Sequence, residues 1–188
     1  MNLYFLGCLL CSSCLFGSCS TQNSAYETSR LQTFDLGMAT VQLPVTWRLL
    51  DTAQAHVSPH KGREYILRNP HSRRADYHDM LVVNFIPLKG QGALTKMGPA
   101  YAVYLRETFN DFQLNSIKDT IVKGQPIQLM QCSFKLKEGK TELISTIAFT
   151  EHRTQLVTVI GTAVRGPQTQ NLKNQSIFRQ AISSFTWK

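Results

Sequence analysis

Apolar and polar residues alternate in the first part of the chain that has a regular pattern. The alternation begins at Phe34 and resumes at Val41, after a turn signal at residues 37–40. A period of two with a glycine in the turn predicts a β-hairpin. Two further strands are predicted at residues 64–68 and 80–86, with a polar loop between them.

The spacing then changes to that of a helix. Gly98 and Pro99 predict its start, because proline is tolerated in the first turn, where its missing N–H costs nothing. Apolar residues follow at intervals of three and four, which indicates one apolar face. These residues are Tyr101, Leu105, Phe109 and Phe112.

Four segments with a period of two come next, each ended by turn residues. They are residues 114–122, 126–136, 141–151 and 154–164. The connections between the last three are short, which predicts an antiparallel meander. One face of the last segment carries small residues, including Gly161 and Ala163, so a helix can pack closely on it. A second helix is predicted from about residue 170 to residue 184 and is expected to cover the sheet.

This order of elements predicts an α+β fold with an antiparallel sheet flanked by helices. Three segments resemble the Mog1/PsbP-like superfamily: the Pro-x-x-Trp turn from Pro44 to Trp47, the strand at residues 156–163, and a closing helix that ends at residues 182–185. The resemblance covers most of residues 34–188. It implies an α-β-α sandwich that serves mostly in protein binding or assembly and rarely in catalysis, although a fold alone does not define a function.

The composition fits one globular domain with a terminal extension. Of 188 residues, 43% are apolar and 17% are charged, which suits a single core and excludes a disordered chain. Seven prolines and 11 glycines are too few for a collagen-like or low-complexity protein. The formal net charge of +8 favours anionic partners.

The N-terminal segment predicts a signal peptide that covers residues 1–18. Residues 3–16 form an apolar run, which is shorter than the roughly 20 residues that span a bilayer. The run ends in Leu15-Phe16-Gly17-Ser18-Cys19, which resembles a bacterial lipobox. This resemblance implies that Cys19 becomes the mature N-terminus and carries acyl chains such as palmitate. Cys14 is an alternative site, and a plain cleaved signal peptide is an alternative to lipidation.

The segment after the signal peptide is polar. Residues 19–32 are predicted to form a lipidated N-terminus and a flexible tether, and residues 33–188 a single α+β domain. Cys132 would then be the only free thiol of the mature chain, and its place in an alternating strand predicts that it is buried. The expected location is the bacterial cell envelope, on a membrane, with the outer membrane favoured.

Basic residues gather around the loop between the two middle strands. They are Lys61, Arg63, Arg68, Arg73 and Arg74. Guanidinium groups bind phosphate and carboxylate well, so this stretch is a candidate surface for an anionic ligand. The alternative interpretation is a solvated loop with local ion pairs.

The same region holds four of the five histidines. They are His56, His60, His71 and His78. Because three such ligands can hold a catalytic zinc, a metal-dependent hydrolase is the alternative function. Their spacing matches no ligand motif, so neither a metal nor another cofactor is expected.

The sequence contains no nucleophile elbow, glycine-rich phosphate loop or zinc-protease motif. Aromatic pairs typical of RNA-binding modules are also absent. We therefore expect a non-enzymatic binding or assembly module that is monomeric and held on a membrane by its N-terminal lipid. Its expected partner is an envelope protein or an acidic surface, and not nucleic acid.

Overall fold

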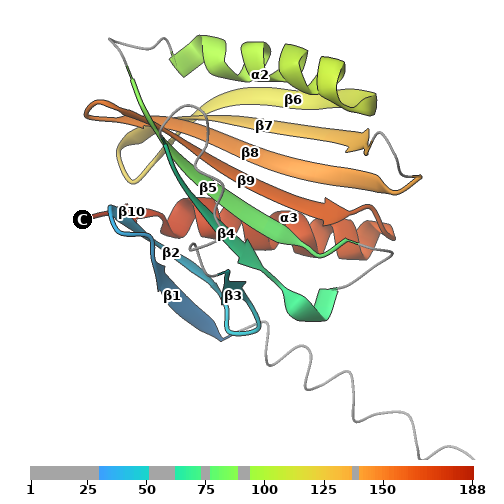
Figure 1. Cartoon of the computed structure of the whole chain (residues 1–188), viewed down its shortest axis with the longest axis horizontal. Helices are drawn as coiled ribbons and strands as arrows, with labels where there is room; N and C mark the ends of the chain where they lie inside the picture. The colour runs from blue at the N-terminus through green and yellow to red at the C-terminus, as the bar shows by residue number, and fades with distance from the viewer. Residues whose placement is uncertain (1–29, 51–61, 73–76, 89–93, 137–139) are drawn as a thin grey trace, which may run out of the picture.

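The computed structural model describes residues 30–50, 62–72, 77–88, 94–136 and 140–188. The described elements form layers around a seven-stranded sheet (Figure 1). Helix α2 (Leu94–Thr108) lies on one face, and helix α3 (Gln168–Ser184) lies on the other beside a three-stranded sheet. This arrangement confirms the predicted α+β class. No helix in the described part of the chain is long and apolar enough to cross a membrane.

The central sheet has the strand order β3-β4-β5-β9-β8-β7-β6, and all neighbours are antiparallel. Its strands are β3 (Arg48–Leu49), β4 (Arg63–Arg68), β5 (Met80–Pro87), β6 (Asn110–Val122), β7 (Gln125–Lys135), β8 (Glu142–His152) and β9 (Gln155–Val164). The predicted meander is confirmed, because β7, β8 and β9 pair in sequence order. The pairing of β5 with β9 joins the N-terminal strands to the meander.

The smaller sheet has the order β1-β2-β10. Its strands are β1 (Leu31–Asp35), β2 (Ala39–Pro44) and β10 (Thr186–Trp187). The predicted hairpin is confirmed, and Gly37 in its turn has φ +76°, a conformation that favours glycine. Leu31 and Gln32, which the sequence assigned to the tether, belong to β1. Gln32 and Thr33 are both polar, so the alternation of apolar and polar residues does not mark the start of β1.

Apolar side chains form two cores, one on each face of the central sheet. The core on the α3 side includes Trp47 and Phe178, whose rings meet edge to face with centroids 6.3 Å apart. The predicted turn before Trp47 is closed by its backbone N–H, which donates to the carbonyl of Pro44 at 2.9 Å. The core on the α2 side includes Met130 and Phe149.

Helix α2 begins earlier than the sequence predicts. Its start was expected at Gly98 and Pro99, yet it runs from Leu94. Pro99 has no N–H, so the carbonyl of Thr95 lacks its usual helical donor four residues later. Gln128 Nε2 donates to that carbonyl at 3.0 Å. The sheet thus supplies the hydrogen bond that the proline removes, and the helix continues upstream of it.

The end of α2 also differs from the prediction. Phe109 and Phe112 were expected on the helix, but α2 ends at Thr108 and β6 begins at Asn110. Phe109 stacks on Phe134 of β7, with ring centroids 4.4 Å apart. Phe109 therefore packs on the sheet, although its spacing in the sequence matches the apolar face of a helix.

Candidate functional site

Helix α2 covers only part of its face of the central sheet. It packs on β6, β7 and β8, whereas β9, β5 and β4 lie farther along the sheet (Figure 1). The strand register places nine side chains of those three strands in three rows on this face. The rows are Glu64, Asn84 and Thr158; Ile66, Val82 and Ile160; and Arg68, Met80 and Thr162. We call these nine residues the open face.

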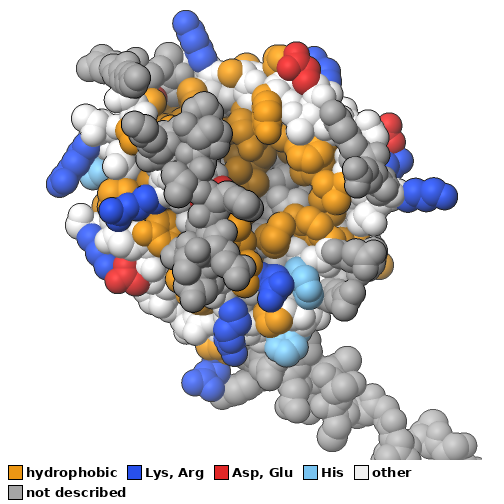
Figure 2. All heavy atoms as spheres, in the orientation of Figure 1, with side chains coloured by type: hydrophobic (Ala, Val, Ile, Leu, Met, Phe, Trp, Pro, Cys, Tyr) orange, Lys and Arg blue, Asp and Glu red, His pale blue; other side chains and the backbone are white. Residues whose placement is uncertain are grey.

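The middle row of the open face is entirely apolar. Ile66, Val82 and Ile160 are all half-buried. Ile66 and Val82 are part of neither apolar core of the described residues. Figure 2 shows hydrophobic side chains gathered in a hollow on this face. Because burying apolar surface releases about 25 cal/mol per Å², a partner that covers this row would gain free energy.

The first row is polar, and two of its three side chains bond to each other. Asn84 Nδ2 donates to Thr158 Oγ1 at 3.2 Å, and the row continues under α2 to Phe149. Tyr101 of α2 meets Phe149 edge to face, with ring centroids 5.5 Å apart, so this row meets α2 at Phe149. Burial, with a smaller contribution from the charge of Glu64, raises the pKa of Tyr101 to about 12, so the Tyr101 side chain is uncharged at neutral pH.

The third row begins with arginine. Arg68 at the end of β4 pairs with Arg48 of β3, so two guanidinium side chains belong to the same end of the sheet. Arg48 Nη1 donates to two backbone carbonyls, those of Val45 at 2.6 Å and Trp47 at 2.8 Å. Lys, Arg and His side chains gather at the lower rim of the hollow in Figure 2. This end of the open face is therefore cationic.

Two buried nitrogen atoms at the same end have no hydrogen-bond partner. They are Nε of Arg68 and Nδ1 of His78. The backbone bond from Asn69 N–H to the carbonyl of Asp79, 3.0 Å long, extends the β4–β5 pairing and holds His78 beside the end of β4. An unpaired buried polar group costs roughly 1–3 kcal/mol, so such groups usually mark a place where a water, ion or ligand binds.

The predicted basic stretch is divided by the fold. Arg63 and Arg68 lie at opposite ends of β4 and, five positions apart, point to opposite faces. Arg63 Nη1 lies 3.7 Å from the position that a Cβ on Gly37 would take, on the α3 side. These two cations therefore do not form one surface. Lys61, Arg73 and Arg74 lie outside the described residues. Arg48, which the sequence analysis missed, is recognised only through its pairing with Arg68.

The histidines are also separated. His71 is exposed in the short 3-10 helix η2 (Pro70–Ser72), and His78 lies two residues before β5. His56 and His60 lie outside the described residues. Within the ranges that the structure describes, no group of three His, Cys, Asp or Glu residues could hold a metal ion.

Cys132 is buried in β7, as predicted. Burial raises the pKa of its thiol to about 12. The reactive thiolate form is therefore negligible at neutral pH, which is the condition of a structural cysteine.

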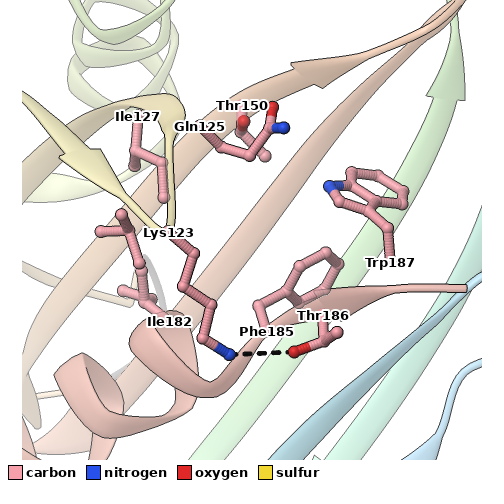
Figure 3. A pocket seen from close by; sticks show the side chains of 9 residues that line it. Lys123, Gln125, Ile127, Thr150, Ile182, Phe185, Thr186 and Trp187 are labelled. Atoms are coloured by element: carbon pink, nitrogen blue, oxygen red, sulfur yellow. Dashed lines mark hydrogen bonds between the residues drawn. The ribbon is translucent and has the colours of Figure 1, made fainter.

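A separate cavity of about 150 Å³ lies beside the C-terminal end of α3 (Figure 3). Lys123, from the turn between β6 and β7, reaches across it. Its ammonium donates to Thr186 Oγ1 at 2.9 Å and to the carbonyl of Ser184 at 3.2 Å. Trp187, which also lines the cavity, stacks on His152 with centroids 4.1 Å apart. These contacts hold β10 against the central sheet, so we assign Lys123 and Trp187 a structural role.

Comparison with known proteins supports the fold. No protein-family model and no curated protein sequence matches the chain. The solution structure of cyanobacterial PsbP from Synechocystis is similar, with a TM-score of 0.64 and 17% identity over 92% of this chain and 99% of the other. The Ran-binding protein Mog1p of Saccharomyces cerevisiae has a TM-score of 0.57 and 12% identity over 84% and 95%. LpqN of Mycobacterium tuberculosis, described as involved in cell envelope biogenesis, has a TM-score of 0.57 and 12% identity over 87% and 95%.

The chain therefore has the Mog1/PsbP-like fold, which confirms the fold that the sequence resemblance implies. At these identities the similarity concerns the fold alone, and the function must be argued from the open face.

Proposed function

We propose that the protein is a non-enzymatic binding module of the bacterial cell envelope, and that the open face is its binding surface. One observation carries this proposal. The apolar row of Ile66, Val82 and Ile160 is flanked by a polar row and a row that begins with Arg68, and α2 packs on other strands. Such a half-buried apolar strip with polar borders is typical of a ligand surface.

The proposed anchor is an acyl group on Cys19 at the outer membrane. It is supported by the lipobox-like sequence at residues 15–19. Since β1 begins at Leu31, residues 19–30 would form the tether. A flexible chain of that length spans roughly 20 Å. The domain would thus stay close to the membrane surface, with the open face free to turn toward a partner.

Photo-crosslinking in intact cells tests the open face directly. A photoreactive phenylalanine analogue replaces Val82 in one strain and Ile121, which is 72% exposed on β6, in a control strain. We expect a defined crosslinked product from position 82 and none from position 121. Equal products from both positions, or none from position 82, would overturn the proposal.

A further inference from the structure

We infer that the ligand of the open face is an anionic amphiphile, whose single acyl chain lies on the apolar row while its phosphate head binds at Arg68. This inference rests on the proposed function and names the ligand class of the same surface. It follows from what each row offers chemically: an alkyl surface in the middle and a cationic end one row away.

The apolar row suits an alkyl chain better than a peptide. Ile66, Val82 and Ile160 cross three neighbouring strands, which corresponds to a strip about 10 Å long. The backbones of β5 and β9 pair along their length with a strand on both sides, and the end of β4 at Leu67 and Arg68 pairs with β3. A peptide therefore cannot add as a strand in the middle of the open face. The flanking Asn84 side chain already donates to Thr158. The centre of the open face therefore offers contact with apolar groups and few hydrogen bonds.

The third row offers one strong donor to a head group. The hydroxyl of Thr162 is already bonded to Tyr77 and lies 3.2 Å from Ser145 Oγ. Met80 has no donor, so Arg68 supplies the N–H groups of this row. Its Nε is buried without a partner, and Arg48 on the adjacent strand adds a second positive charge. Guanidinium bonds to phosphate are charge-assisted and stronger than neutral ones.

The row of Arg68 and the apolar row are close enough for one ligand to contact both with its head group and its acyl chain. Arg68 and Ile66 are two residues apart on β4, so their rows are about 6.6 Å apart. A head group at Arg68 would therefore lie beside the end of the apolar row that Ile66 forms. A chain attached to that head can turn directly onto Ile66 and Val82.

Native mass spectrometry of the full-length protein in a neutral detergent tests this inference. The probes are lysophosphatidylglycerol, which is anionic, and lysophosphatidylcholine with the same acyl chain, which is zwitterionic. Both probes carry a phosphate, but the choline of the second probe adds a positive charge that the adjacent Arg68 and Arg48 repel. We therefore expect the anionic probe to bind about tenfold more tightly. Equal binding of the two probes, or no bound probe, would overturn the inference.

Two matched variants locate the head group. Arg68→Gln should weaken binding of the anionic probe about tenfold, whereas Arg63→Gln, the same substitution on the opposite face of β4, should leave it unchanged. Val82→Glu should reduce binding of both probes, and unchanged thermal melting would show that it still folds. Equal effects of the two arginine variants would contradict the assignment of Arg68. A crosslink from position 82 to a protein, with no lipid product, would overturn the amphiphile and leave the binding module standing.

Discussion

Gln128 of β7 holds the first turn of α2 through Thr95, whose carbonyl accepts its Nε2 hydrogen at 3.0 Å. The same amide accepts a hydrogen bond from the backbone N–H of Gly98 and donates to Asp119 Oδ1 at 2.9 Å. Gln128 is only 2% exposed, so water does not readily replace these bonds. One buried amide thus positions the helix that forms a wall of the open face.

Replacement of Gln128 by Leu should lower the free energy of unfolding by about 2 kcal/mol, because it leaves buried backbone groups of α2 unpaired. In a Pro99→Ala background the cost should be about 1 kcal/mol smaller, since residue 99 then has an N–H for the carbonyl of Thr95. Urea denaturation of the four proteins measures this coupling. Strictly additive effects would show that Gln128 does not compensate for the proline.

Gly161 is the closest contact between the sheet and α3. A Cβ at this position would lie 2.3 Å from Cγ of Phe178, which is itself 1% exposed. Gly161→Ala should therefore destabilise the fold by about 3 kcal/mol, the upper range for an overpacked core. Gly124→Ala is the control, because a Cβ there meets nothing within 4 Å and pays only for φ +77°, about 1 kcal/mol. Equal urea midpoints for the two variants would contradict this packing.

The contact between Gly161 and Phe178 shows what the sequence could predict. Alternation identified the long strands, and the small residues of β9 indicated where a helix would pack, because both depend on local pattern. The start of α2 could not be predicted, since it depends on Gln128, a distant residue in another strand. The two-residue strands β3 and β10 have no periodicity to detect.

The candidate site was predicted less well than the fold, and the reason is strand geometry. Arg63 and Arg68 are close in the sequence, but a separation of five places them on opposite faces of β4. The three rows of the open face combine residues from β4, β5 and β9. Such a surface follows from strand register, which a single sequence does not specify.

Stability should fall at alkaline pH through Tyr101. Its pKa is raised from 10.0 to about 12 by burial, so the unfolded chain loses the proton first as the pH rises. The contribution of protonated Tyr101 to the free energy of unfolding is complete below pH 10 and is lost progressively between pH 10 and pH 12. Tyr101→Phe should reduce this decline by about 1 kcal/mol at pH 11, as measured by urea denaturation across that range. An identical decline in both proteins would show that Tyr101 ionises normally in the fold.

The proposed anchor predicts a specific dependence on Cys19. Cys19→Ala should abolish labelling with a palmitate analogue and release the protein from the membrane fraction, because the acyl chains supply the binding energy. Cys14→Ala, a matched substitution in the predicted signal peptide, should leave labelling and location unchanged. Continued membrane binding and labelling of the Cys19 variant would contradict the anchor.

Occupancy of the open face can be measured by thiol labelling. Val82→Cys places a thiol on the apolar row, and Ile121→Cys places one on the exposed part of β6. Cys132 adds little background, because burial raises its pKa to about 12. The central claim predicts that a maleimide labels position 82 much more slowly in isolated native membranes than in the purified protein, while position 121 reacts equally in both. Equal rates at position 82 in the two preparations would mean that nothing covers the open face and would contradict the account.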